Sequence, residues 1–113
     1  MAYDKELAER ISATFGTVPI VEKKMFGGIG YLLHGHMACG VLDNALIVRV
    51  GKEDYGEALT RPHTRVFDTT GRVMNGWVMV NPAGTADEDD LSAWVEQGIK
   101  FVLTLTFLHY SWY

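Results

Sequence analysis

The sequence predicts an α+β domain, because two stripes of apolar residues at helical spacing frame a series of short segments with strand-like alternation. Turn signals separate these segments at close intervals, which favours antiparallel strands joined by hairpins. The chain has 113 residues, of which 48% are hydrophobic, and this suits one domain with a sizeable core. The expected order is α-β-β-β-α-β-β-α, with helices covering one face of an antiparallel sheet.

The opening segment predicts an amphipathic helix. Its apolar residues recur every four positions, with charged residues between them: Tyr3, Leu7, Ile11 and Phe15. Asp4 is placed to cap the N-terminus of this helix, and Gly16 suits its C-terminus. Pro19 then directs the chain into an extended conformation.

Residues 20–50 predict three consecutive antiparallel strands. The first strand places three apolar residues on one face: Ile29, Tyr31 and Leu33. A hairpin turn at His34-Gly35-His36 leads into the second strand at 37–42. Two residues, Asp43-Asn44, then connect it to the third strand at 45–50, in which alternate residues face opposite sides of the sheet.

A short helix over 51–60 follows, with Tyr55 among its apolar contacts, and Arg61-Pro62 ends it. Two further strands come next, with a turn at Asp68–Gly71 between them. Asn75-Gly76 is a rival turn signal. We interpret it as a β-bulge, because this choice leaves two strands of ordinary length.

Residues 81–84 predict a loop, and the last helix begins after it. The acidic run Asp87–Asp90 opens this helix, where the helix dipole favours negative charge, so we expect no calcium site there. The helix carries the longest apolar stripe in the chain: Leu91, Trp94, Val95, Gly98, Phe101, Val102 and Leu105.

Composition argues against several classes of function. Ten Lys and Arg against fourteen Asp and Glu give a net charge of −4, which disfavours direct nucleic-acid binding. No apolar stretch approaches the roughly 20 residues of a membrane span, and no signal-peptide pattern opens the chain. The single cysteine, Cys39, has apolar neighbours and predicts a buried thiol in a reducing compartment. We therefore expect a cytoplasmic protein with no membrane association.

A set of short motifs occurs in a fixed order along the chain. The motifs are Lys24-Met25-Phe26-Gly27-Gly28-Ile29-Gly30, Leu46-Ile47-Val48-Arg49-Val50, Arg61-Pro62-His63, Gly71-Arg72-Val73-Met74, Gly76-Trp77-Val78 and Leu91-Ser92-Ala93-Trp94-Val95. Together they resemble the N-terminal domain of the TfoX/Sxy family of bacterial competence regulators. The likeness spans residues 3 to 105, and its most specific part combines the Met-Phe-Gly-Gly, Arg-Pro-His and Gly-Trp-Val segments.

The resemblance implies a stand-alone copy of the N-terminal half of such a regulator, without the helical C-terminal domain of longer members. The implied fold is also similar to that of type III secretion chaperones, which pair as dimers and hold other proteins. We expect this domain to cover residues 1–106. Residues 107–113 form an atypical aromatic tail, which packs onto this domain, packs onto a partner or reflects a reading-frame accident.

The candidate chemistry of the motifs is weak. His34, His36 and Cys39 have metal-ligand character, but a stable site needs further ligands and none has suitable spacing. No acid or oxyanion hole accompanies Cys39, so we expect no catalytic residue. The glycines of the motif Met25, Phe26, Gly27, Gly28 precede a strand rather than a helix, which predicts tight backbone packing and not a phosphate cradle. We expect no metal and no cofactor, and these motifs indicate no enzyme activity.

Arg49 is the most informative single residue. It lies mid-strand among apolar neighbours, on the face that it shares with Ile47. A buried arginine needs a partner, so it either forms an internal ion pair or presents its guanidinium to a ligand in a groove on the sheet. In the second case the other candidate ligand-binding residues are Arg61, His63, Arg72, Tyr55 and Trp77.

Two functions of different classes remain open. The first is a non-enzymatic protein-interaction or regulatory module, which acts as a homodimer or with another protein and uses Trp77, Trp94 or the aromatic tail as anchors. The alternative is a small-anion-binding domain or enzyme that uses Arg49, Arg61 and His63. This alternative requires the three side chains to converge in one pocket.

Overall fold

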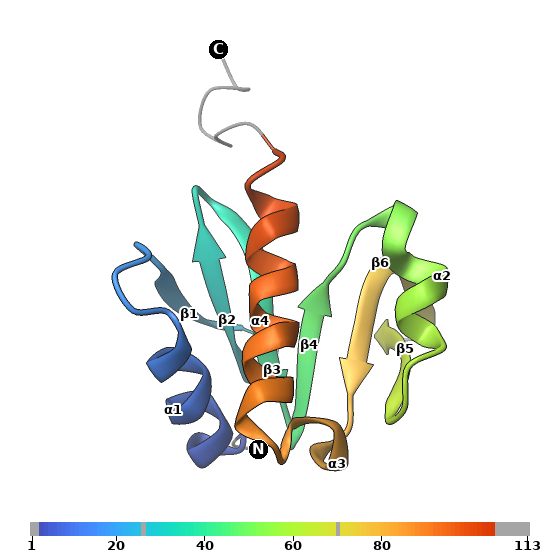
Figure 1. Cartoon of the computed structure of the whole chain (residues 1–113), viewed down its shortest axis with the longest axis horizontal. Helices are drawn as coiled ribbons and strands as arrows, with labels where there is room; N and C mark the ends of the chain where they lie inside the picture. Colours follow the sequence, from blue (N-terminus) through green and yellow to red (C-terminus); the bar gives the residue numbers. More distant parts are fainter. Residues whose placement is uncertain (1–2, 26, 70, 106–113) are drawn as a thin grey trace.

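The computed structural model describes residues 3–25, 27–69 and 71–105, which form a six-stranded antiparallel sheet and four helices. The strands are β1 (Val21–Met25), β2 (Gly28–Leu33), β3 (His36–Leu42), β4 (Ala45–Arg49), β5 (Thr64–Thr69) and β6 (Arg72–Val80). The helices are α1 (Lys5–Thr14), α2 (Lys52–Leu59), α3 (Pro82–Thr85) and α4 (Glu88–Val102). Figure 1 shows α4 crossing the sheet over β3 and β4, with α1 and α2 on either side of it. The predicted α+β class is confirmed.

The strand order in the sheet is β1-β2-β3-β4-β6-β5, and all neighbouring strands run antiparallel. The predicted turn at His34-Gly35-His36 is confirmed, because Leu33 pairs with His36 across a two-residue connection. The predicted Asp43-Asn44 hairpin is confirmed in the same way by the pairing of Leu42 with Ala45. His34 and Asp43 adopt positive φ values of 56° and 57°, which tight hairpin turns require.

The predicted bulge at Asn75-Gly76 is also present. Val66 pairs with Val78, but Asp68 pairs with Val73. Two residues along β5 therefore correspond to five along β6, and the extra residues bulge out of β6. Gly76 has a φ of 88°, and its carbonyl oxygen accepts hydrogen bonds from the backbone N–H groups of Val50 (2.8 Å) and Gly51 (3.0 Å). This bulge therefore ties β6 to the start of α2.

Both long helices begin at the aspartates expected to start them. The carboxylate of Asp4 accepts a hydrogen bond from the backbone N–H of Leu7 at 3.0 Å. The carboxylate of Asp87 accepts from the N–H groups of Asp89 at 2.7 Å and Asp90 at 3.4 Å. Each carboxylate satisfies backbone donors that the first helical turn leaves without partners.

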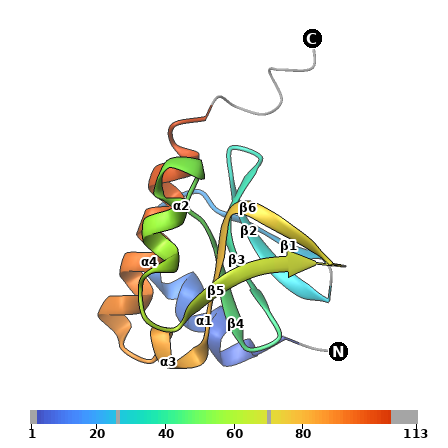
Figure 2. The same cartoon turned by 90° about the vertical axis from the view of Figure 1, so that its right-hand side faces the viewer.

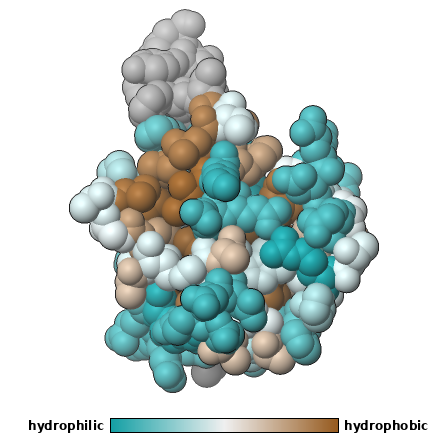
Figure 3. Space-filling model, viewed as in Figure 1, coloured by the Kyte–Doolittle hydropathy of each residue, from teal (hydrophilic) through white to brown (hydrophobic). Residues whose placement is uncertain are grey.

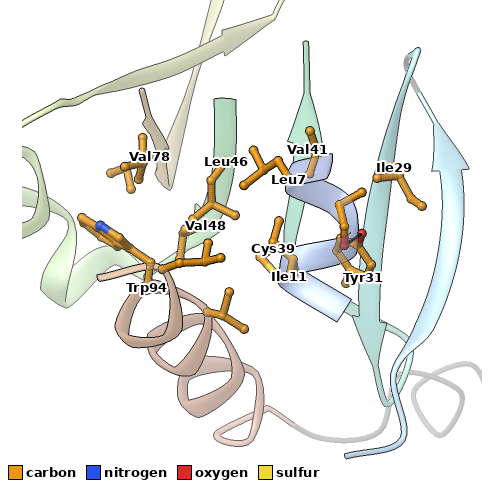
Figure 4. Packing of buried hydrophobic residues seen from close by; sticks show 14 of the residues in the cluster. Leu7, Ile11, Ile29, Tyr31, Cys39, Val41, Leu46, Val48, Val78 and Trp94 are labelled. Atoms are coloured by element: carbon orange, nitrogen blue, oxygen red, sulfur yellow. Dashed lines mark hydrogen bonds between the residues drawn. The ribbon is translucent and has the colours of Figure 1, made fainter. Parts of the chain in front are cut away.

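The helices and one face of the sheet enclose the main core, part of which Figure 4 shows. The labelled side chains come from α1, β2, β3, β4, β6 and α4: Leu7, Ile11, Ile29, Tyr31, Cys39, Val41, Leu46, Val48, Val78 and Trp94. Tyr31 is fully buried and donates its hydroxyl to the carbonyl oxygen of Ala8 at 3.1 Å, which connects β2 to α1. Leu46 belongs to this core, whereas Ile47 belongs to a second cluster on the opposite face, as the strand alternation predicts.

Two elements differ from the predicted order. Only three strands were expected over 20–50, but β1 (Val21–Met25) forms a separate sixth strand at the sheet edge. Its residues are mostly exposed, so no apolar alternation marked it in the sequence. Residues 81–84 were expected to form a loop, but Pro82–Thr85 form the short helix α3, whose first turn accommodates the proline.

All the described helices lie on one side of the sheet (Figure 2). We call the opposite side of the sheet the open face. Seen from the helix side, the surface is mostly hydrophilic over α2, and hydrophobic residues gather near the C-terminal end of α4, where Leu103 is 58% exposed (Figure 3). None of the described helices is both long and apolar enough to cross a lipid bilayer.

Candidate functional site

The open face contains a small apolar depression, which we call the methionine hollow. Its volume is about 110 Å³. It is lined by Met25, Ile29, Met37, Val41, Leu42, Ile47, Phe67, Met74 and Trp77. Met25 belongs to the edge strand β1 and Phe67 to the opposite edge strand β5. The sheet therefore curls enough to bring residues of both edges to one depression.

Two glycines form the floor of the methionine hollow. Gly30 of β2 and Gly40 of β3 are directly paired. A Cβ atom at Gly30 would lie 3.0 Å from the terminal methyl of Met25, and one at Gly40 would lie 2.6 Å from that of Met37. The side chains of Met25 and Met37 therefore pack directly on the backbone of Gly30 and Gly40. Because methionine is flexible and polarisable, such a surface adapts to apolar groups of different shape.

A larger groove lies on the other side of Trp77, which lines both depressions. We call it the arginine groove, and its volume is about 670 Å³. It lies between the end of β4, the start of α2, the bulge of β6 and the C-terminal half of α4. Its charged residues are Arg49, Lys52, Glu53, Asp54 and Lys100.

The guanidinium of Arg49 lies over two aromatic rings in this groove. Its central carbon is 5.4 Å from the ring centroid of Trp77 and 5.4 Å from that of Phe101. Burial lowers the pKa of Arg49 below its ordinary value. Neither ion pair of the described residues involves Arg49, so the internal ion pair, one of the two predicted arrangements, does not form there. Cation–π contacts take its place.

Arg49 and Trp77 are the only two of the six predicted ligand-binding residues among the described lining of the arginine groove. Arg61 lies next to it, because its Nη1 donates to Oε1 of Gln97 at 2.8 Å and Gln97 lines the groove. The guanidinium carbon of Arg61 is also 3.6 Å from the centroid of the Trp94 ring. Arg61 therefore fastens the end of α2 to α4.

The remaining three predicted residues lie elsewhere. Tyr55 packs against the main core. His63 is exposed with a φ of 68°, and its side chain lies beside Gly84 of α3. Arg72 is exposed at the start of β6. The basic side chains of the anion hypothesis thus do not converge in one groove, and a binding role for each of them stays a prediction.

The glycine motif packs as the sequence predicts. Gly27 has a φ of 77° in the connection between β1 and β2. A Cβ at Gly28 would collide with the carbonyl oxygen of Val41, so the two backbones approach closely. Met25 lines the methionine hollow. Phe26 and the aromatic tail at 107–113 lie outside the described residues.

The predicted burial of Cys39 is confirmed. The residue is fully buried, and burial raises the pKa of its thiol to about 12, so the reactive thiolate is strongly disfavoured. His34 lies in the hairpin turn between β2 and β3, and His36 begins β3. Within residues 3–25, 27–69 and 71–105, no three His, Cys, Asp or Glu side chains form a group suited to a metal ion.

Sequence reasoning did not find the methionine hollow. A signal was nevertheless present, because four of the five methionines fall in predicted or observed strand segments: Met25, Met37, Met74 and Met79. The isolated glycines Gly30 and Gly40 were a second signal, since a strand glycine often marks close packing over the backbone. Only the pairing of the strands brings these residues to one face.

The model of the family described as the TfoX N-terminal domain matches residues 12–102, which is most of the chain. No curated protein sequence matches it.

Proposed function

Because the chain belongs to the TfoX N-terminal domain family, we propose that it is a regulatory protein-interaction module, acting in the cytoplasm, that binds its partner on the open face. The observation that carries this proposal is the methionine hollow, an apolar depression over which no described helix packs. Uncovered apolar surfaces of this kind are typical of protein contact sites. The regulatory part rests on the resemblance to the N-terminal half of bacterial competence regulators.

The partner is either a second copy of the chain, giving a homodimer, or another protein. The two sheet edges are poorly suited to pairing with it. The edge strand β1 carries Lys23 and Lys24, and the edge strand β5 carries Arg65 and Asp68. Charged side chains on an edge strand oppose the addition of a further strand. The open face is therefore the better surface for a partner.

Site-specific photo-crosslinking of the full chain tests this proposal. A benzophenone side chain replaces Met74, which lines the hollow, and in a control variant it replaces the exposed Glu57 of α2. We expect adducts from position 74 and few from position 57 after irradiation in living cells. An adduct of twice the mass of the chain identifies the homodimer, and any other mass identifies a different protein. Equal labelling at both positions, or none at position 74 in a folded chain, would refute the proposal.

One observation favours the alternative of a small-anion-binding domain or enzyme. Arg49 is a cation without a carboxylate partner among the described residues, in a groove of about 670 Å³. Inorganic phosphate is the probe, and an anion that binds the folded state raises the melting temperature. If the alternative holds, phosphate stabilises the unchanged protein and the control variant Arg72→Gln but not Arg49→Gln. An equal change in melting temperature for the two variants would show that Arg49 does not bind the phosphate.

A further inference from the structure

The charges of the chain are unevenly divided between its strands and its helices. The whole chain has a net charge of −4. Five of its ten basic residues nevertheless lie in strands: Lys23, Lys24, Arg49, Arg65 and Arg72. Only two of the fourteen acidic residues lie in strands, namely Glu22 and Asp68. The other twelve lie in helices, at helix caps or in the β3–β4 turn.

The strand pairing directs three of the five basic residues to the open face, whereas the guanidinium of Arg49 lies in the arginine groove over Phe101 of α4. Lys23 pairs with Gly30, which forms the floor of the methionine hollow. Arg65 pairs with Met79, a member of the apolar cluster on the open face. Directly paired residues of antiparallel strands share a face. Arg72 reaches the same face by alternation with Met74 along β6.

Each of these three basic residues is two positions from a residue that lines the hollow. Two positions along a strand keep a side chain on the same face and move it by about 7 Å. The three pairs are Lys23 and Met25, Arg65 and Phe67, and Arg72 and Met74. Positive charge therefore flanks the methionine hollow on the strands β1, β5 and β6.

The acidic residues of the strands point the other way. Glu22 pairs with Tyr31 of the main core, and its carboxylate accepts a hydrogen bond from the hydroxyl of Ser12 on α1 at 3.0 Å. Asp68 pairs with Val73, which alternates with Met74 and so lies on the opposite side of the sheet. No described strand residue thus presents a carboxylate on the open face.

We propose that the open face binds an acidic protein segment, which inserts aliphatic or aromatic side chains into the methionine hollow and places its carboxylates against the neighbouring Lys23, Arg65 and Arg72. This inference rests on the proposed function above and specifies the charge and the apolar side chains of the partner. Complementary charge steers such an encounter and selects the partner. The hollow supplies the desolvated apolar contact that binding at a protein surface needs.

Two other occupants fit the observations less well. A second copy docked face to face would place these basic residues against their own counterparts, and like charges brought together across an interface are unfavourable. A single-stranded nucleic acid needs exposed aromatic rings on which its bases stack. Phe67 is only 8% exposed, and the ring of Trp77 is already covered by Arg49.

Fluorescence anisotropy on the full chain with three labelled peptides tests the proposal. The first peptide alternates Asp or Glu with Leu and Phe, the second replaces each acid by its amide, and the third replaces each acid by Lys. We expect the acidic peptide to bind at least roughly tenfold more tightly than the other two, and its affinity to fall as salt is added. The triple charge reversal Lys23→Glu, Arg65→Glu, Arg72→Glu should abolish this preference, since all three side chains are exposed and can change without disturbing the core.

A control with the same change of net charge reverses three exposed lysines of the helices, and the variant Lys5→Glu, Lys52→Glu, Lys100→Glu should bind the acidic peptide nearly as tightly as the unchanged protein does. Thermal melting of each variant shows that it is folded. Equal binding of the acidic and amide peptides, or tighter binding of a labelled oligothymidylate than of the acidic peptide, would overturn the proposal. If position 74 crosslinks to a partner while the peptides show no charge preference, the proposed interaction module is supported and the proposed acidic character of its partner is refuted.

Discussion

The packing of α4 on the sheet can be tested with one substitution, Gly98→Ala. Gly98 lies in the interior of α4, and a Cβ atom there would be 2.5 Å from the carbonyl oxygen of Ala38 on β3. Backbone atoms cannot rotate away as the end of a side chain can, so α4 or β3 must shift. Overpacking of a core contact costs about 1–3 kcal/mol. Alanine recovers about 1 kcal/mol of helix propensity, which leaves a net loss of about 1 kcal/mol.

The same substitution at a second glycine provides the control. Gly56 lies inside α2, and a Cβ atom there would meet nothing within 4 Å. Gly56→Ala should therefore show the propensity gain alone and stabilise the protein by about 1 kcal/mol. The two variants are thus expected to differ by about 2 kcal/mol in the free energy of unfolding, with opposite signs relative to the unchanged protein.

Urea unfolding followed by far-UV circular dichroism measures both variants. The midpoint should fall for Gly98→Ala and rise for Gly56→Ala, without a change in the denaturant slope. If Gly98→Ala is as stable as Gly56→Ala, the close approach of α4 to β3 does not limit packing and the reasoning is wrong. A changed slope would instead mean that the unfolded state or the cooperativity has altered.

Three further predictions concern burial, capping and the attachment of α2. Burial raises the pKa values of Cys39 and Tyr31 to about 12, above their ordinary values of 9.0 and 10.0, so their neutral forms stabilise the fold. The free energy of unfolding should stay constant up to about pH 9 and then decline toward pH 12, because the unfolded chain loses these protons first. Cys39 should react with iodoacetamide at pH 8 only in denaturant, and rapid labelling of the folded chain would contradict its burial. Asp87→Ala should lower the free energy of unfolding in urea by about 1 kcal/mol through loss of the α4 cap, whereas Asp87→Asn should retain most of it. Arg61→Ala should cost about 1 kcal/mol in the same assay, because it removes the ring contact with Trp94, and an unchanged midpoint would show that this contact contributes nothing.

The sequence predicts the local structure well where one rule dominates. The caps at Asp4 and Asp87 follow from side-chain oxygens placed just before an apolar stripe. The hairpin at Asp43-Asn44 follows from two turn-forming residues between apolar runs. Such signals act over a few residues, so they are legible without knowledge of the rest of the chain.

The sequence predicts less where the partner of a residue is distant. Strand β1 was not predicted, because an exposed edge strand lacks the alternation of apolar and polar residues that burial of one face requires. The internal ion pair that was one of two expectations for Arg49 does not form among the described residues, and its guanidinium lies over the rings of Trp77 and Phe101 instead. Phe101 is half the chain away, and only the docking of α4 on β3 and β4 brings it there.

Residue pattern and motifs by themselves determined the class of the fold, the buried thiol of Cys39 and the resemblance to the TfoX N-terminal domain family. The tertiary structure alone decided which face of the sheet stays open, and that Met25 and Phe67 from its two edges line one hollow. The physical reason is that alternation assigns a side chain to one of two faces, but the curl and pairing of the strands decide which side chains of a face meet.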